Sequence, residues 1–255
     1  MNVSQIIFSP TGGTEKVADI ITKEWGMPVN RIDLSDAKTD YSAISLEKED
    51  IAVIAVPSYG GRVPALAVQR ISKIHGNQTR CIIVCVYGNR AYEDTLIELK
   101  DVAEKSGFKV IAAIAAIAEH SIMHQYAEGR PDSEDRSELQ HFAEKILEKI
   151  SGNSTEISTL QIPGNHPYKK AGGAGLVPKA GNKCTGCGLC AKRCPAQAIG
   201  KENLKTTDSK KCISCMRCVV HCPQSARKVN GAMVSMAALA LKKTCSIRKE
   251  NELYI

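Results

Sequence analysis

The sequence predicts an α/β fold for residues 1–150, with a doubly wound, five-stranded parallel sheet. Short apolar runs alternate there with longer segments of helical periodicity. Residues 50–56 form a run rich in β-branched side chains, which is typical of a strand buried on both faces. Eight of the eleven cysteines lie between Cys184 and Cys222, and they predict a second, small α+β domain.

The elements of the first domain follow from periodicity and from residues that begin or end helices. Pro64 suits the first position of a helix, and Gly107 suits the position just after one. The expected strands are 3–8, 29–34, 50–56, 80–87 and 108–118. The expected helices are 14–25, 64–74, 92–106 and 133–150.

The rest of the chain divides by composition. Residues 151–180 lose periodicity and are rich in Ser, Thr, Gly, Asn and Pro, so we expect a linker. Residues 181–230 carry the cysteines and form the expected second domain. Residues 231–255 are expected to be a helical tail. No apolar stretch reaches the roughly 18 residues of a membrane span, and no signal peptide pattern follows Met1, so a cytoplasmic protein without a membrane span is expected.

Charge is distributed unevenly. Residues 1–150 contain 17 Lys and Arg against 22 Asp and Glu, whereas residues 151–255 contain 17 against 5. Such asymmetry is one sign of nucleic-acid binding. No binding motif or aromatic platform accompanies it, and cysteine thiolates of metal clusters would offset part of the positive charge. We therefore expect no nucleic-acid partner.

The cysteines repeat a spacing. The pattern C-x2-C-x2-C-x3-C-P occurs twice, 28 residues apart. Three closely spaced thiolates can hold three corners of a cubane, while the fourth reaches the other cluster. The predicted ligands are Cys184, Cys187, Cys190 and Cys222 for one cluster, and Cys212, Cys215, Cys218 and Cys194 for the other. Zinc sites and disulfides are the alternatives, but zinc sites usually use paired C-x2-C knuckles separated by a long spacer.

Residues 181–228 resemble a bacterial two-cluster ferredoxin. The resemblance rests on the two cysteine runs, each followed by proline (Pro195 and Pro223). It implies two [4Fe–4S] clusters of low potential.

A loop of hydroxyls and glycines follows the first strand. Residues 9–14 read Ser-Pro-Thr-Gly-Gly-Thr and precede a helix, so their amides are suited to bind an anion. Without lysine in the loop, and without a G-x-G-x-x-G pattern, a phosphate monoester fits better than a nucleoside triphosphate or a dinucleotide. The alternative is an ordinary helix start capped by Thr11 or Thr14.

Two further loops end the third and fourth strands. Residues 57–64 and 87–92 each offer tyrosine and glycine, which suit contact with a planar ligand. Together with the 9–14 loop they resemble the flavodoxin family, and this resemblance implies FMN. By position it implies a phosphate site at Ser9, Thr11, Gly12, Gly13 and Thr14, an N5-side loop at Ser58, Tyr59, Gly60 and Gly61, and a pyrimidine-side loop at Gly88, Asn89, Arg90 and Tyr92.

Three points qualify this assignment. Arg62 and Arg90 add positive charge where long flavodoxins are acidic, which would raise the flavin potential. The tyrosines are alternatively ordinary residues of the rim. His120 or His124, after the fifth strand, is a candidate proton donor to the flavin or to a substrate, or else a polar loop residue.

The whole chain resembles the fused flavodoxin–ferredoxin proteins of anaerobic bacteria and archaea. The resemblance implies electron transfer between FMN and two [4Fe–4S] clusters, with interconversion of one- and two-electron steps. Redox partner proteins are the expected partners. The alternative is an FMN-dependent reductase that passes electrons from the clusters to a small-molecule acceptor.

Overall fold

The structure, a computed structural model, describes residues 2–152, 160–172 and 175–255. Its main sheet has the strand order β2-β1-β3-β4-β5-β8. Its strands are β1 (Val3–Ile7), β2 (Val29–Asp33), β3 (Ile51–Pro57), β4 (Arg80–Tyr87), β5 (Lys109–Ile117) and β8 (Glu252–Tyr254). The first five are parallel, and the order 2-1-3-4-5 is that of the flavodoxin-like doubly wound sheet. The predicted fold class is confirmed, and β8 adds a sixth, antiparallel strand.

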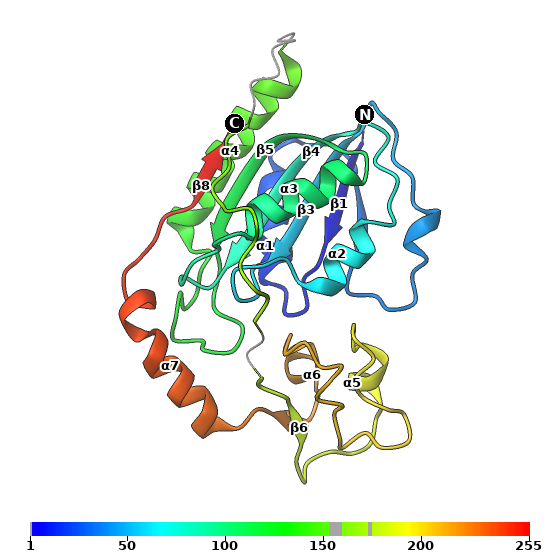
Figure 1. Cartoon of the computed structure of the whole chain (residues 1–255), viewed down its shortest axis with the longest axis vertical. Helices are drawn as coiled ribbons and strands as arrows, with labels where there is room; N and C mark the ends of the chain where they lie inside the picture. Colours follow the sequence, from blue (N-terminus) through cyan, green and yellow to red (C-terminus); the bar gives the residue numbers. More distant parts are fainter. Residues whose placement is uncertain (1, 153–159, 173–174) are drawn as a thin grey trace.

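Helices cover both faces of this sheet (Figure 1). The helices α1 (Gly13–Lys23) and α4 (Ser133–Ser151) pack on one face. The helices α2 (Ala65–Ile71) and α3 (Thr95–Lys105) pack on the other, beside the short 3-10 helix Tyr41–Ala43. Residues 51–56 are fully buried between the two layers, as expected for an unalternating apolar strand.

A cysteine-rich domain, residues 175–230, lies at the edge of the sheet where the parallel strands end (Figure 1). A two-stranded antiparallel sheet and two short helices form its regular structure. These elements are β6 (Lys179–Ala180), α5 (Leu189–Lys192), α6 (Arg217–Val220) and β7 (Arg227–Lys228). In doubly wound sheets, ligands bind at this edge, so the position of the domain bears directly on the candidate site.

The sequence duplication is also a duplication of backbone. Left-handed residues occur at three positions of each half, 28 residues apart: 186, 188 and 197, then 214, 216 and 225. The first half uses glycine at two of them, whereas the second has Ser214 (φ 52°) and Met216 (φ 59°). Non-glycine side chains are rare in this region, so the turn geometry around the cysteines is imposed by the repeated fold.

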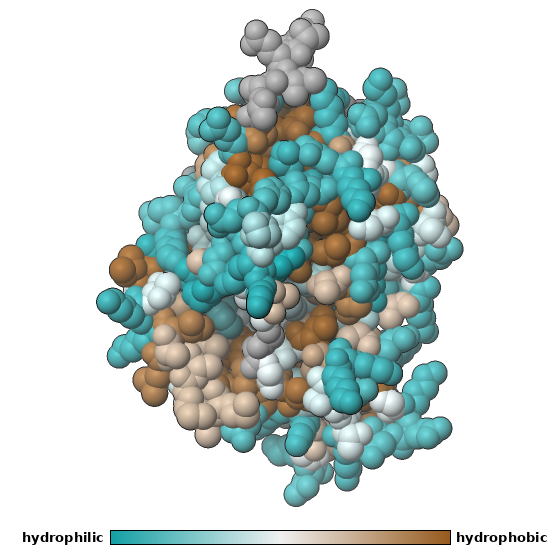
Figure 2. Space-filling view, viewed as in Figure 1, coloured by the Kyte–Doolittle hydropathy of each residue, from teal (hydrophilic) through white to brown (hydrophobic). Residues whose placement is uncertain are grey.

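The tail begins with α7 (Gly231–Cys245), which runs from the cysteine-rich domain back toward the sheet (Figure 1). One side of α7 packs on Met123 and Tyr126, and the Tyr126 hydroxyl donates to the Ala238 carbonyl at 2.5 Å. The other side exposes apolar side chains (Figure 2). Met236 is 64% exposed and Leu239 is 71% exposed. Neither α7 nor any other described helix combines the length and the apolarity that crossing a membrane requires.

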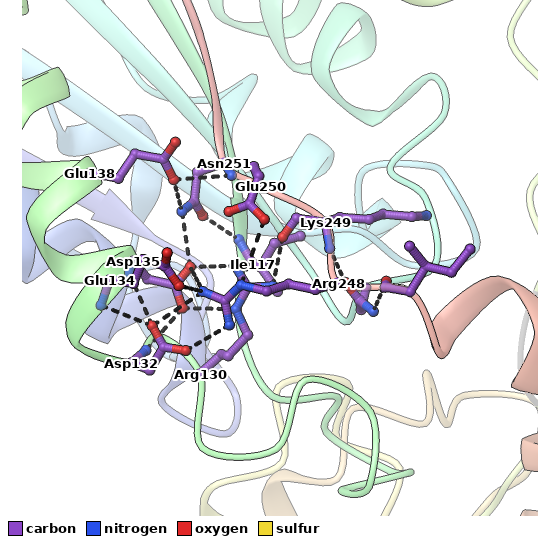
Figure 3. A network of polar contacts seen from close by, with 12 residues as sticks. Ile117, Arg130, Asp132, Glu134, Asp135, Glu138, Arg248, Lys249, Glu250 and Asn251 are labelled. Atoms are coloured by element: carbon purple, nitrogen blue, oxygen red, sulfur yellow. Dashed lines mark hydrogen bonds and ion pairs between the residues drawn. The ribbon is translucent and has the colours of Figure 1, made fainter.

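A buried polar network holds the end of the tail in place (Figure 3). Arg130 forms an ion pair with Asp135, with Nε 2.8 Å from Oδ2, and the Asp135 side chain is fully buried. The Asn251 amide donates to Asp135 at 3.0 Å and accepts from the Ile117 amide at 2.9 Å. Arg248 adds an ion pair to Asp132 at 2.8 Å. These contacts direct residues 252–254 onto the edge of β5.

The described part of the linker lies along α3. The Asp94 carboxylate accepts from the amides of Asn165 and Lys169, at 2.9 and 2.7 Å. Asp101 accepts from the Tyr168 hydroxyl and pairs with His166. Residues 160–172 are therefore fastened to the sheet domain, and they lead the chain to its carboxyl edge.

Candidate cofactor sites

The 9–14 loop joins β1 to α1 and presents free amides. Gly12 adopts φ 93° and precedes the helix without a side-chain cap. Thus neither Thr11 nor Thr14 caps α1, contrary to that alternative. The Ser9 hydroxyl accepts from the Glu15 amide at 3.0 Å, whereas the amides of residues 11–14 have no acceptor within the described ranges. Unpaired amides at a helix N-terminus fit an anionic group.

The loop after β3 lies on the same edge. The Ser58 hydroxyl is hydrogen-bonded to the Thr95 hydroxyl at 2.7 Å, and the Tyr59 ring contacts Phe8 edge-on with centroids 6.5 Å apart. Gly60 and Gly61 have φ values of 61° and 83°. A Cβ on Gly61 would collide with the Glu93 side chain, so this turn requires glycine.

The loop after β4 is engaged by the tail. The buried Asn89 amide donates to the carbonyls of Cys245 and Ile247, both at 2.8 Å, and accepts from the Lys249 amide at 3.2 Å. The Tyr92 hydroxyl bonds to residues of β8, Glu252 at 2.7 Å and Tyr254 at 2.8 Å. The side chains of Asn89 and Tyr92 are therefore turned to the tail, and Gly88 and the backbone of the loop are left for a ligand.

Both arginines that were expected to make the site positive are paired with glutamates. Arg62 is bidentate on Glu98, at 2.7 and 2.6 Å, and its guanidinium lies 4.8 Å from the centre of the Tyr168 ring. Arg90 pairs with Glu93 at 2.8 Å. The expected excess of positive charge from these two residues is thus largely neutralised, which corrects that part of the sequence interpretation.

His120 lies against Gly88 at the end of β5. A Cβ on Gly88 would lie 2.7 Å from the His120 Cβ. The Nδ1 atom of His120 accepts hydrogen bonds from the amides of Ile122 and Met123, both at 3.2 Å. Burial lowers the pKa of His120 below its usual range. Because Nδ1 accepts two hydrogen bonds, the neutral ring carries its proton on Nε2. His124 is instead exposed and paired with Glu119.

The eight cysteines of the repeat surround two cavities. The first cavity is lined by four cysteines that we call the outer quartet: Cys184, Cys187, Cys190 and Cys222. Cys194, Cys212, Cys215 and Cys218 line the second, the inner quartet. Each cavity thus takes three cysteines from one run and one from the other. In the described residues no three His, Cys, Asp or Glu side chains converge as ligands of a single ion, and the cavities instead have the four-thiol lining that a cubane requires.

Hydrogen-bond donors surround these sulfurs. The amides of Ala198 and Ala226 donate to the sulfurs of Cys194 and Cys222, both at 3.3 Å. Arg227 is fully buried, and its Nη1 lies 3.6 Å from the Cys190 sulfur. The Arg227 charge also acts on Cys218 of the inner quartet, where it partly offsets the rise in the pKa of that thiol that burial causes. One buried cation therefore influences both quartets.

The inner quartet lies beside the loop that follows β3 in the sheet domain. Ile213 packs against the apolar core of that domain. Burial, then the neighbouring sulfurs of Cys215 and Cys212, raise the pKa of Tyr59 well above its usual value. The outer quartet is more open, since Cys187 is exposed whereas Cys215 is buried.

Two arginines fasten the domains together. Arg70 on α2 donates to the Leu34 carbonyl at 2.6 Å and to the Pro195 carbonyl at 2.7 Å. Arg217 on α6 reaches the Ser9 carbonyl at 3.4 Å. Sequence reasoning missed Arg70, Arg217 and Arg227. For the last two a signal exists, because the first repeat has Leu189 and Ile199 at the equivalent positions, 28 residues earlier.

Comparison with known proteins matches the cysteine-rich segment to one protein family. Residues 183–227 match the family model described as a 4Fe-4S dicluster domain. This segment is therefore an iron–sulfur domain, and it follows a flavodoxin-like fold in the same chain. The combination supports a role in electron transfer. No curated protein matches the chain.

Solved flavodoxin structures resemble the sheet domain. A flavodoxin of Streptococcus pneumoniae TIGR4 is 21% identical, with 58% of this chain and 99% of that chain covered and a TM-score of 0.42. The two-electron reduced flavodoxin of Megasphaera elsdenii is 20% identical, with 56% and 98% covered and a TM-score of 0.40. A Fusobacterium nucleatum flavodoxin bound to flavin mononucleotide is 16% identical, with 58% and 99% covered and a TM-score of 0.40.

Proposed function

We propose that the chain is an electron carrier that holds FMN in its sheet domain and two [4Fe–4S] clusters in its cysteine-rich domain. The observation that carries the proposal is the contact between the two candidate sites: the inner quartet lies beside Tyr59 at the ligand-binding edge of the sheet. Because FMN exchanges one or two electrons and each cluster exchanges one, the pair interconverts two-electron and one-electron steps.

Each cluster is assigned one quartet. The outer cluster is held by Cys184, Cys187, Cys190 and Cys222, and the inner cluster by Cys194, Cys212, Cys215 and Cys218. The crossed membership agrees with the way two-cluster ferredoxin runs share their fourth cysteine. The amide donors on Cys194 and Cys222 would stabilise the added negative charge of a reduced cluster.

The flavin site is assigned to the loops at the carboxyl edge. The amides of residues 11–14 and the hydroxyl of Ser9 fit the FMN phosphate. Tyr59, Gly60 and Gly61 would border one side of the ring, with Gly88 and the backbone of Arg90 on the other. His120 would present its Nε2 proton from beyond Gly88.

The two quartets have different surroundings, and this suggests a direction for electron flow. Cys187 of the outer quartet is exposed, so we assign exchange with redox partner proteins to that side. The inner quartet, next to the sheet domain, would pass electrons to and from the flavin. Lysines near the outer quartet, such as Lys183 and Lys192, favour encounter with an acidic partner.

A second candidate is a reductase that delivers electrons to a small molecule. The observation that favours it is His120, whose neutral imidazole lies at the flavin edge with no partner for Nε2 among the described residues. Substrate turnover with dithionite as electron source would distinguish this enzyme from a carrier.

Cofactor analysis tests the proposal. Protein prepared without oxygen is expected to contain about one FMN and about eight iron and eight sulfide per chain. Exchange of Cys222 for serine is expected to perturb the same cluster signal as exchange of Cys184, and exchange of Cys194 the same signal as Cys212. Cys245 lies outside both quartets and provides the control. A colourless or zinc-loaded protein would overturn the proposal.

A further inference from the structure

Arg217 extends from the cysteine-rich domain onto the 9–14 loop. Its Nη1 lies 3.4 Å from the Ser9 carbonyl oxygen, and its Nη2 lies 3.3 Å from the Asp33 carboxylate. Asp33 ends β2 and Ser9 follows β1, and these strands are neighbours in the sheet. A guanidinium from one domain therefore lies beside the anion-binding loop of the other.

The protein leaves part of this guanidinium unused. Both contacts are longer than the roughly 2.7–2.9 Å that is typical of charge-assisted hydrogen bonds. The Nε of Arg217 is buried without an acceptor in the described part of the chain, and the side chain as a whole is only 15% exposed. A buried, incompletely paired cation costs free energy unless a further anion binds it.

The repeat shows that the cluster fold does not require arginine at this position. The equivalent residue of the first repeat is Leu189, which likewise begins a short helix after a left-handed residue. Leu189 lines the outer cavity, whereas Arg217 faces the sheet domain. The 9–14 loop itself contains no basic side chain, whereas Arg217 places a guanidinium at the Ser9 carbonyl.

We infer that Arg217 binds the phosphate group of the flavin nucleotide across the domain boundary and thereby couples flavin binding to docking of the cysteine-rich domain. This inference rests on the proposed function, because it takes the 9–14 loop as the phosphate site. The nucleotide would then be bound by the amides of one domain and by the guanidinium of the other.

The test compares FMN with riboflavin, which lacks only the phosphate. Flavin is removed from protein whose clusters are intact, and both flavins are titrated by calorimetry. Arg217→Leu, which copies the first repeat, is expected to weaken FMN binding by about tenfold to a hundredfold. Riboflavin binding is expected to change by less than about twofold. Exchange of exposed Lys228 for glutamine, in the same domain, is the charge-matched control.

Asp33→Asn separates a phosphate ligand from an interdomain ion pair. It removes the carboxylate that competes for Arg217, and Asp33 is 47% exposed, so the fold should tolerate the change. If Arg217 binds phosphate, Asp33→Asn strengthens FMN binding. If Arg217 serves only to pair with Asp33, the variant leaves FMN binding unchanged or weakens binding of both flavins, and either result shows that the inference is wrong.

The remaining outcomes are also decisive. Equal losses for FMN and riboflavin in Arg217→Leu, or no loss for either, would overturn the inference and leave the proposed function intact. Wild-type protein that binds neither flavin would refute the proposed flavin site itself, and the inference with it.

Discussion

At the scale of single residues, the two halves of the cysteine repeat differ where they meet other parts of the molecule. Arg217 and Arg227 replace Leu189 and Ile199 of the first half. One contacts the sheet domain and the other is buried between the quartets. The spacing of the cysteines predicts the ligand sets, because binding a cubane would impose that spacing. The roles of these arginines instead follow from tertiary contacts that no local pattern encodes.

Exchange of Arg227 for methionine is expected to make both cluster potentials more negative by tens of millivolts. In the proposed sites, the buried cation near Cys190 and Cys218 would stabilise the extra electron of a reduced cluster, and methionine keeps most of the volume without the charge. Potentiometric titration measures the shift. Exchange of the adjacent, exposed Lys228 for glutamine should leave the potentials nearly unchanged, and an equal shift there would contradict a specific role for Arg227.

His120 predicts a pH dependence of stability. Because burial lowers its pKa in the folded state, the unfolded chain binds the proton more readily. The folded state is therefore expected to lose stability as the pH falls through the unfolded value of about 6.5, until the lower folded pKa is passed. His120→Asn keeps an acceptor for the amides of Ile122 and Met123 but does not titrate.

The comparison uses urea unfolding at about pH 7.5 and about pH 5.5. The loss of unfolding free energy between the two values is expected to be smaller in His120→Asn than in the wild type. His75→Asn, at an exposed site, should behave as the wild type does. An identical loss in the wild type and in His120→Asn would contradict the assignment.

At the scale of elements, the sequence predicts those strands and helices whose apolar residues recur with a regular period. The five parallel strands and the helices between them follow from apolar runs and helical spacing, and the structure has them. The sequence does not predict β8, since residues 252–254 are a three-residue segment with one aliphatic side chain. Tertiary contacts position this segment, among them the hydrogen bonds of Asn251 and Asn89. For the same reason, the tail contacts of Asn89 and Tyr92 were not foreseen.

Removal of the Asn89 side chain is expected to release the tail. Asn89→Ala leaves three backbone groups of the tail without their partner, at a cost of about 1–3 kcal/mol. Amide hydrogen exchange of residues 245–255 should accelerate, while exchange in β3 stays unchanged. Asn182→Ala, at an exposed site, is the control. Unchanged protection of the tail would show that the polar network around Asp135 and Asn251 (Figure 3) holds the tail without Asn89.

At the scale of the whole molecule, the functional proposal depends on how the domains dock. The inner quartet meets the sheet domain through Ile213, and Arg70 bonds to carbonyls of both domains. Neither contact belongs to a recognisable motif. The sequence therefore predicts the two domains, but their mutual placement emerges only from the folded chain.

Arg70→Gln is expected to slow internal electron equilibration several-fold. The variant removes the bond to Pro195 without touching a cysteine or the 9–14 loop. Pulse reduction followed at flavin and cluster absorbances measures the rate, and static titration should give wild-type potentials. An unaltered rate would indicate that Arg70 does not control docking. Exchange of exposed Arg193, whose guanidinium is hydrogen-bonded to His221 among the described residues, provides the control.

The return of the chain to the sheet through β8 has a topological consequence. The cysteine-rich domain is inserted between two segments of its neighbour, the linker after α4 and the α7 tail, rather than appended to it. A domain connected covalently at both ends explores far fewer orientations than a domain on a single linker, so the local concentration of one proposed redox centre around the other is high. Cleavage of either connection would therefore leave the two domains associated through the other.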